Sequence, residues 1–263
     1  MSYDFSGQAA LVTASSSGLG KASARALARG DANVVVNGRD EERLAEAVED
    51  LSEEGDGTVV GQQGDLTVKA DIEALVQRTV DEFGGLDHLV TSAGGPPSGP
   101  FLETTDEDWY QAFDLLVMSV VRAVREAEPH LRADGGGTIV NITSRSVKEA
   151  IGSLVLSNSV RMSVIGLEKT LSKELGPEIR ANAVLPASHE TSRIEDLIEQ
   201  AVERGEYDSY EEGREARGES VPLGRIGDPM ELGETVAFLS SERSSYISGV
   251  SIPIDGGSGA SNL

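Results

Sequence analysis

The stretch that decides the fold is Ala10-Leu-Val-Thr-Ala-Ser-Ser-Ser-Gly-Leu-Gly20. Its apolar start, Ala9 to Val12, predicts a buried strand, and the small residues after it lead into a segment rich in helix formers, Lys21 to Arg29. A strand, a glycine turn and a helix in this order form an anion site, because the N–H groups at the helix start point outward and the helix dipole favours negative charge. Gly18 and Gly20 let the backbone approach a phosphate closely. Taken alone, the stretch also fits an ordinary strand-to-helix turn, so the rest of the chain must decide.

The composition describes a globular and strongly acidic protein. The chain has 263 residues, 38% of them hydrophobic, which suffices for one large α/β domain with a substantial core. A net charge of −23 repels nucleic acid and anionic lipid, so we expect neither nucleic acid nor a membrane as a partner. A diffuse acidic excess is typical of salt-adapted proteins, whose self-repulsion weakens the fold in low salt. An ordinary acidic protein is the alternative.

The sequence also lacks several kinds of signal. It contains no cysteine, which rules out disulfides and thiolate ligands or nucleophiles. No stretch approaches the roughly 20 apolar residues of a membrane span, and the first residues lack the basic and apolar regions of a secretory signal. The histidines show no metal-ligand spacing, so we expect no metal site. These features favour a cytoplasmic protein.

Short β-rich runs alternate with helical segments along the whole chain. Further strands are expected at 34–37, 58–66, 87–91, 137–143, 179–185 and 250–254, and helices at 41–51, 70–83, 106–132, 157–175 and 230–239. This alternation predicts a single α/β domain over residues 1–263, with a doubly wound parallel sheet of the Rossmann type and a ligand crevice beyond the carboxyl ends of its strands. We expect the charged segment 190–219 to form a helical lid inserted over that crevice. A solvated pair of surface helices is the alternative for that segment.

Several motifs in a fixed order carry a resemblance to a known family. They are Thr13-Ala-Ser-Ser-Ser-Gly-Leu-Gly20, Asp65-Leu66, Thr91-Ser-Ala-Gly94, Asn182-Ala-Val-Leu-Pro-Ala187 with Thr191, Pro222-Leu-Gly-Arg-Ile-Gly-Asp-Pro229 and Asp255-Gly-Gly257. They resemble the cofactor turn, the adenine-binding acid, the N-N-A-G and N-x-V-x-P-G segments and the C-terminal signature of the short-chain dehydrogenase/reductase family. Ala14 stands where the first glycine of the turn is usual. The resemblance implies a nicotinamide cofactor and a redox reaction between a carbonyl and an alcohol.

The expected cofactor site combines the turn with the other motifs of the resemblance. Its residues are Thr13, Ser15, Ser16, Ser17, Gly18, Leu19, Gly20, Asn37, Arg39, Asp65, Leu66, Ser92, Ala93, Gly94, Arg161, Pro186, Ala187, His189 and Thr191. An acid at the end of the second strand would bond the ribose hydroxyls of NAD, but here Asn37 stands in that neighbourhood and Arg39 follows. A guanidinium matches a 2′-phosphate in charge and geometry, and Ser15 or Ser16 could add a donor. We therefore expect NADP(H), with NAD(H) as the alternative; Arg39 could instead pair with Glu42 on the surface.

The resemblance breaks at the catalytic residues. The family uses a serine after the fifth strand and a Tyr-x-x-x-Lys pair on the next helix, in which the tyrosine transfers the proton and the lysine holds the nicotinamide ribose. Ser144 fits the serine, but alignment on the V-x-G-L segment puts Ser157 at the tyrosine position and Arg161 at the lysine position. Leu116 falls where an asparagine is usual. We expect Ser144, Ser157 and Arg161 to form the catalytic site, although a serine hydroxyl is a poor acid and an arginine keeps its proton.

Three other kinds of side chain could supply the proton. His189 lies in a loop that borders the nicotinamide in the family and would titrate near neutral pH, although a solvent-facing histidine is the more ordinary role. Lys148 could reach the site from four residues beyond Ser144. Tyr207 or Tyr210 could swing in from the charged segment; otherwise all three residues belong to the surface.

These expectations favour an NADP(H)-dependent oxidoreductase that transfers a hydride between the nicotinamide and a small carbonyl or alcohol. Two alternatives stay open: an NAD(P)-binding protein without redox turnover, acting as a sensor or structural subunit, and an enzyme of the same fold that performs elimination or isomerisation. The resemblance also implies a homotetramer or dimer, for which the runs 113–124 and 164–175 are sufficiently apolar. The substrate itself cannot be read from the sequence, because specificity lies in the variable lid.

Overall fold

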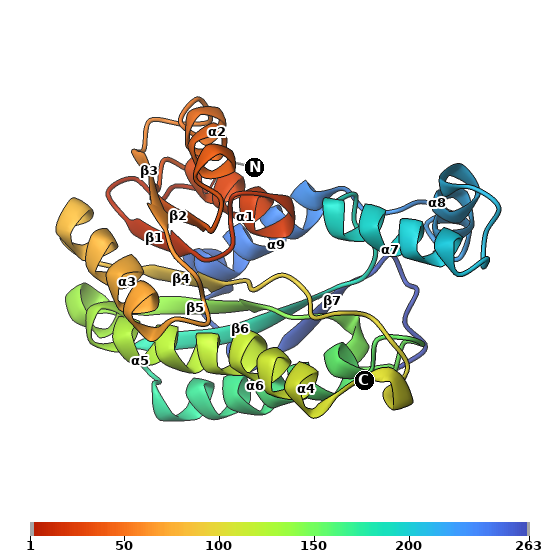
Figure 1. The fold of residues 1–263 in the computed structure, drawn as a ribbon. Helices are drawn as coiled ribbons and strands as arrows, with labels where there is room; N and C mark the ends of the chain where they lie inside the picture. The colour runs from red at the N-terminus through yellow and green to blue at the C-terminus, as the bar shows by residue number, and fades with distance from the viewer. Residues whose placement is uncertain (1–2, 262–263) are drawn as a thin grey trace.

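Seven short runs of β-branched and apolar residues form one parallel sheet in the order β3-β2-β1-β4-β5-β6-β7 (Figure 1). The computed structural model describes residues 3–261. The strands are β1 (Ala9–Val12), β2 (Asn33–Gly38), β3 (Val59–Gln63), β4 (His88–Thr91), β5 (Gly137–Ile142), β6 (Ile179–Pro186) and β7 (Ser251–Ile254). Leu11 of β1 lies beside Val35 of β2 and Leu89 of β4. Because the strand order reverses at β1, a ligand crevice is expected beyond the carboxyl ends of β1 and β4.

Helices cover both faces of the sheet, which confirms the doubly wound α/β fold (Figure 1). They are α1 (Gly18–Ala28), α2 (Glu41–Leu51), α3 (Lys69–Phe83), α4 (Asp106–Phe113), α5 (Ser119–Arg132), α6 (Val155–Glu174), α7 (Ser192–Glu203), α8 (Tyr210–Glu219) and α9 (Pro229–Ser240). One apolar core lies between the sheet and α1, α2 and α9. A second core lies between the opposite face and α3, α5 and α6. The central strands are therefore buried on both sides, as their continuous apolar runs predict.

The long helix expected over 106–132 is interrupted. A π-helical turn, Asp114–Met118, separates α4 from α5. The wider turn carries Leu116 and Val117, and both are buried in the core. The expectation of one regular α-helix was therefore wrong, and Leu116 lies within the irregular turn.

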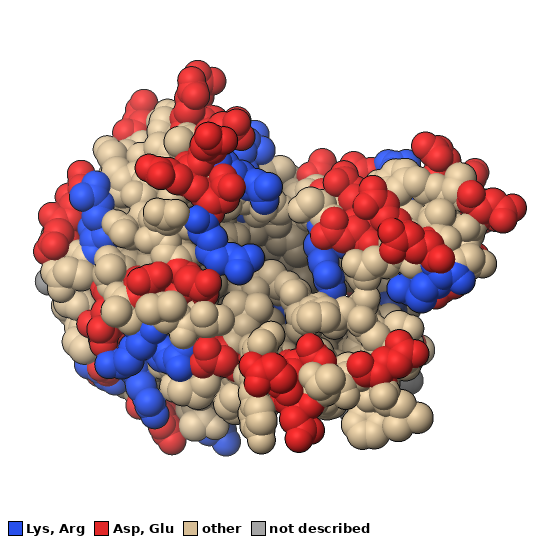
Figure 2. All heavy atoms as spheres, in the orientation of Figure 1, with Lys and Arg blue, Asp and Glu red and all other residues tan. Residues whose placement is uncertain are grey.

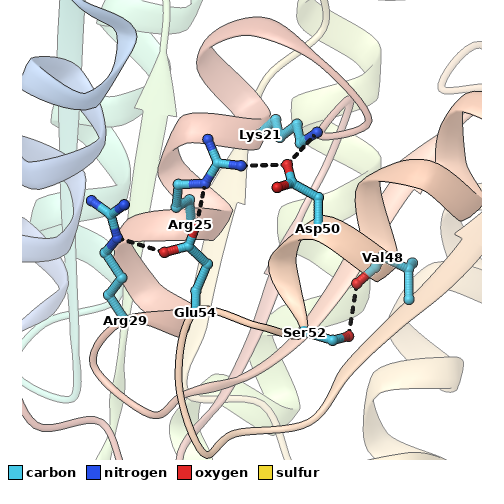
Figure 3. Close-up of polar contacts among 7 residues, drawn as sticks. All are labelled: Lys21, Arg25, Arg29, Val48, Asp50, Ser52 and Glu54. Carbon is cyan, nitrogen blue, oxygen red and sulfur yellow. Dashed lines mark hydrogen bonds and ion pairs between the residues drawn. The ribbon is translucent and has the colours of Figure 1, made fainter.

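A ladder of ion pairs fastens α1 to α2 and to the residues that follow it (Figure 3). Lys21 pairs with Asp50 at 2.7 Å, and Arg25 contacts both Asp50 and Glu54. Arg29 adds a second contact to Glu54 at 2.7 Å. Each exposed pair contributes little by itself, but the shared carboxylates link three cations into one network. The network holds the outer side of the helix that starts at the glycine turn.

The charged segment 190–219 forms the helical pair α7 and α8, which projects beside the carboxyl edge of the sheet (Figure 1). Ile198 and Ala201 give α7 a buried side. Gly213 of α8 approaches Ile198 so closely that a β-carbon there would lie 2.8 Å from the isoleucine Cγ2 atom. The two helices therefore pack on each other despite their charge. Within residues 3–261, no helix combines the length and apolarity needed to cross a membrane.

Candidate active site

The glycine turn after β1 has the backbone geometry of a close-approach site. A β-carbon on Gly20 would lie 2.3 Å from the carbonyl oxygen of Ala14, so no other residue fits there without moving the turn. Gly18 has a φ of 57°, which favours glycine. Ala14 also has a positive φ, 46°, at the position where the sequence departs from the family's glycine. The turn therefore keeps the glycine geometry at a residue that tolerates it poorly.

Three residues expected to bind cofactor instead brace this turn from below. The Thr13 hydroxyl donates to the carbonyl of Ser92 at 2.7 Å and accepts its N–H at 2.9 Å. The Ser15 hydroxyl donates to the Val12 carbonyl at 2.6 Å and accepts the N–H of Asn37 at 2.9 Å. Neither Thr13 nor Ser15 lines the cavity described below. Both hydroxyls are engaged inside the protein, so neither side chain is directed at the cavity.

Asn37 has a similar bracing role. Its side-chain oxygen accepts the N–H of Ala14 at 3.0 Å, and its amide nitrogen donates to the carbonyls of Gln62 and Gly64 at 3.2 and 3.1 Å. The amide thus ties the turn to β3 and the residues beyond it. Asn37 borders the cavity but is only 1% exposed, so its amide serves the turn.

A cavity of about 880 Å³ opens at the carboxyl edge of the sheet, where Figure 2 shows a deep hollow. It is lined by most of the expected residues, namely Ser16, Ser17, Gly18, Leu19, Gly20, Asn37, Arg39, Asp65, Leu66, Ser92, Ala93, Gly94, Ser144, Ser157, Arg161, Pro186, Ala187, His189 and Thr191. The cavity therefore joins the glycine turn to the candidate catalytic residues. Four arginines that the sequence analysis did not single out also line it: Arg43, Arg145, Arg193 and Arg217.

The end of β2 presents an arginine to the cavity and has a glycine, Gly38, just before it. A β-carbon on Gly38 would lie 2.7 Å from the hydroxyl oxygen of Ser16, so a larger residue there would have to displace the Ser16 side chain. Arg39 is exposed on the cavity wall, and among residues 3–261 it has no ion pair, with Glu42 or any other acid. The alternative that Arg39 serves only a surface ion pair is therefore not supported.

Asp65 lies on the same side of the cavity. One of its carboxylate oxygens accepts the N–H and the hydroxyl of Thr67, at 2.8 and 2.7 Å. These two bonds, with a smaller contribution from the charge of Arg39, hold the pKa of the Asp65 carboxyl below its usual value. Asp65 therefore presents an ionised carboxylate, which can accept a hydrogen bond from an amino group.

The three candidate catalytic residues meet on the opposite wall. Ser144 begins a short 3₁₀ turn after β5, and its hydroxyl accepts the N–H of Ser146 at 3.1 Å. The hydroxyls of Ser146 and Ser157 lie 3.1 Å apart. Asn158 fixes this arrangement, because its amide exchanges two hydrogen bonds with the backbone of Ile151 at 3.2 and 2.9 Å. The loop from β5 to α6 is thereby held so that Ser144 and Ser157 both face the cavity.

Arg161 lies one helical turn beyond Ser157 and is only 8% exposed. Its guanidinium donates to the carbonyl of Gly94, and its buried Nε has no partner. Burial, together with the nearby charge of Arg193, lowers the pKa of Arg161 to about 10. Arg161 therefore brings a desolvated positive charge to the cavity wall between the turn and the two serines.

Comparison with known proteins supports the resemblance over the whole chain. Residues 13–259 match the family model described as "Enoyl-(Acyl carrier protein) reductase". The chain is 31% identical over 255 residues to "Dehydrogenase/reductase SDR family member 4" of Caenorhabditis elegans, covering 96% of this chain and 95% of that protein. The chain belongs to the short-chain dehydrogenase/reductase family. As a member, it is an oxidoreductase of the class that acts on CH–OH and carbonyl groups.

Solved structures of this family agree with the fold. The L-sorbose reductase of Gluconobacter frateurii, complexed with NADPH and L-sorbose, has a TM-score of 0.93 and 30% identity, covering 99% of this chain and 100% of that chain. Actinorhodin polyketide ketoreductase with NADPH has a TM-score of 0.92 and 31% identity, with the same coverage. Structural neighbours of this chain in the short-chain dehydrogenase/reductase family therefore bind NADPH.

Of the alternative proton donors, only His189 lines the cavity that contains Ser144 and Ser157. His189 lines the cavity but is buried, so the expected solvent-facing role is wrong. Its Nδ1 lies 3.2 Å from the carbonyl of Ala187, and burial lowers the pKa of His189. Lys148, Tyr207 and Tyr210 do not line the cavity. Within residues 3–261, no cluster of histidine and acidic side chains has the grouping of a metal site.

Proposed function

We propose that this protein transfers a hydride between NADP(H) and a small carbonyl or alcohol substrate, with NADP(H) preferred over NAD(H). The observation that carries the proposal is one continuous cavity that contains the glycine turn, Arg39 and Ser144. It supplies a phosphate site at one end and a hydroxyl donor at the other. NADPH in the structural neighbours supports this choice of cofactor.

The residues present fit the dinucleotide. The turn ending at Gly20 would hold the pyrophosphate at the start of α1, and its tight path requires glycine at position 20, where a β-carbon would meet the Ala14 carbonyl. Arg39 would bind the 2′-phosphate, assisted by the hydroxyl of Ser16. Asp65 would accept from the adenine amino group. When bound, the nicotinamide supplies the hydride.

The catalytic end is proposed to work without the usual tyrosine and lysine. Ser157 and Arg161 stand at those two positions by alignment of the following V-x-G-L segment. Arg161 donates to ribose hydroxyls and keeps positive charge near the reacting centre, while Ser144 donates to the carbonyl oxygen. Because the cavity lining in the described part of the chain contains neither tyrosine nor lysine, we assign the proton to water held by the serine hydroxyls.

The experiment measures NADPH oxidation at high salt with a panel of small ketones, comparing the native protein with Ser144→Ala. We expect the substitution to lower kcat/KM by about 100-fold, because it removes a donor to the developing oxyanion, while the Kd for NADPH stays unchanged. Ser52→Ala is the matched control, since that hydroxyl bonds only the Val48 carbonyl on α2. Turnover of the native protein no greater than that of Ser144→Ala would contradict the proposed reaction.

We also propose that the chain forms a homodimer or homotetramer through the face of α4 and α6. Large apolar side chains are exposed on or next to these packed helices: Phe101, Leu102, Tyr110, Phe113 and Met162. An oligomer that covers these side chains would remove their apolar surface from water. Light scattering at high salt tests the proposal: Tyr110→Lys with Phe113→Lys should yield monomers, and an unchanged mass would contradict it.

A further inference from the structure

The charge of the cavity is opposite to that of the protein. Its lining contains six arginines (Arg39, Arg43, Arg145, Arg161, Arg193 and Arg217) and two carboxylates, Asp40 and Asp65. The chain as a whole carries a net charge of −23. Figure 2 shows acidic side chains over much of the visible surface and basic ones on the walls of the hollow. The cavity therefore favours anionic ligands. The arginines next to β2, which include the proposed 2′-phosphate ligand, are only some of the six.

Two of these arginines, Arg161 and Arg193, lie close enough to repel each other electrostatically. Arg193, near the start of α7, reaches across to donate to the carbonyl of Pro96 at 2.9 Å. Its guanidinium lies over Gly95, whose β-carbon would be 2.9 Å from the arginine Nε. Arg161 donates to the carbonyl of Gly94, two residues away on the same loop. The two guanidinium groups therefore share one short stretch of chain between the helical pair α7 and α8 and the catalytic serines.

Neither guanidinium has an acidic partner. Among residues 3–261, no carboxylate lies within ion-pair distance of Arg161 or Arg193, although Asp196 contributes a more distant charge. Burial lowers the pKa of Arg193, as it does that of Arg161. By contrast, the cations of α1 all contact carboxylates (Figure 3). Arg161 is buried and Arg193 is half-buried. The two neighbouring cations repel each other, and a charge that is withdrawn from water without an acidic partner is costly, so this pair is typical of a binding site rather than of a structural contact.

We propose that the substrate carries a carboxylate near its reacting carbonyl, and that Arg193 binds this carboxylate directly while the charge of Arg161 reinforces the site. The inference rests on the proposed function and specifies its substrate class as oxo acids and the corresponding hydroxy acids. A planar guanidinium matches a carboxylate through two parallel N–H donors, and among the described residues Arg193 uses only one group on Pro96. In the reaction the hydride adds to the carbonyl carbon, a proton from water adds to its oxygen, and NADPH becomes NADP⁺.

The first test needs no variant. Calorimetry with the full chain and NADP⁺ at high salt compares 2-oxobutanoate with its methyl ester, which differ only in the charged group. We expect the acid to bind at least 30-fold more tightly. Equal binding of the ester would overturn the carboxylate inference. Inorganic phosphate that competes as well as the acid would also overturn it, because the site would then be a general anion site.

A variant then assigns the contact to Arg193. Arg193→Gln should weaken binding of 2-oxobutanoate by about 30-fold and leave the ester unchanged, whereas Arg193→Lys should recover part of the loss. Arg204→Gln is the matched control directly after the same helix, because Arg204 pairs with Glu206 outside the cavity. An unchanged NADPH Kd shows that Arg193→Gln folds. Equal loss of acid and ester binding would contradict the direct contact.

These binding measurements separate the inference from the proposed function. Binding of the acid that depends on Arg193, without NADPH oxidation, supports the carboxylate site and contradicts hydride transfer. Oxidation of NADPH by the ester and a neutral ketone at the same kcat/KM as the acid supports hydride transfer and contradicts the carboxylate site.

Discussion

The two walls of the cavity differ in whether their polar side chains have partners inside the protein. On the wall formed by β1, α1 and β2, the hydroxyl of Thr13, the hydroxyl of Ser15 and the amide of Asn37 are all bonded inside the protein. On the wall formed by the β5–α6 loop, α6 and α7, Arg161 has an unpartnered buried Nε, and Arg193 has no acidic partner among the described residues. The first wall therefore has internally bonded polar groups beneath its backbone, whereas the second has guanidinium groups without acidic partners.

This contrast agrees with the proposal that the first wall receives the dinucleotide and the second the substrate. A dinucleotide has one shape, so the backbone that receives it must stay fixed, and internal hydrogen bonds fix it. A substrate site needs polar groups that point into the cavity. The stability lost by leaving these groups without internal partners must be supplied by the rest of the fold. Glu168, beneath the second wall on α6, is a further buried polar group with one unpartnered oxygen.

Breaking the first wall should have the largest effect. Gly20→Ala places a methyl group 2.3 Å from the Ala14 carbonyl, so the turn must move away from the phosphate position. We expect the Kd for NADPH, measured by fluorescence titration, to rise more than 100-fold. Gly85→Ala is the control, because a β-carbon there meets nothing within 4 Å. Tight NADPH binding by Gly20→Ala would show that the turn does not hold the cofactor.

Removing the charge at the end of β2 should have a selective effect. Arg39→Ala should raise the Kd for NADPH by roughly 10- to 100-fold, as expected for loss of a charge-assisted hydrogen bond, and leave the Kd for NADH nearly unchanged. Arg78→Ala, which breaks an exposed ion pair on α3, serves as the control. If both dinucleotides lost affinity equally, the assignment of Arg39 to the 2′-phosphate would be wrong.

The effect of the buried Glu168 carboxyl on the free energy of unfolding can be measured through its pH dependence. Burial raises the pKa of Glu168 to about 7, so the folded protein holds a proton that the unfolded chain releases above its ordinary value of 4.5. This group therefore lowers stability as pH rises from about 4.5 to 7. Glu168→Gln should raise the free energy of unfolding at pH 8 by roughly 1 to 3 kcal/mol and have little effect at pH 4.

Denaturant melts at the two pH values check this expectation. Glu174→Gln, at the exposed end of α6, is the matched control. A gain of the same size at pH 4 and pH 8 would mean that the charge of Glu168 is not its source.

The smallest expected effect is a change in stability when Ala14, in the glycine turn, is replaced by glycine. Ala14 has a φ of 46°, so Ala14→Gly removes strain but adds freedom to the unfolded chain. We expect a net stabilisation of about 0.5 kcal/mol. Thermal melts at high salt would detect it as a higher Tm, and a lower Tm would show that the added freedom of the unfolded chain outweighs the relief of strain.

Strand and helix order followed from the sequence, because short apolar runs and helical periods are local signals. The side-chain roles were harder, since Thr13 and Ser15 belong to a binding motif yet point beneath it. A motif gives the path of the backbone and leaves open which side of the turn each hydroxyl occupies. Arg193 was missed because its reach to Pro96 depends on how α7 packs, although its place two residues after Thr191 was a usable signal.

The reversal of charge between the cavity and the outer surface also bears on how fast an anion arrives. NADPH must cross a repelling field before it reaches the arginines that attract it. Salt weakens the two fields unequally, because the screening length falls to roughly 3 Å at 1 M while contacts inside a desolvated cavity are screened much less. We therefore expect the association rate to rise with ionic strength, the reverse of ordinary electrostatic steering. Stopped-flow mixing over a salt series measures this rate directly. Salt would speed the entry of the anion by screening the acidic surface, while the arginines inside the cavity keep their attraction.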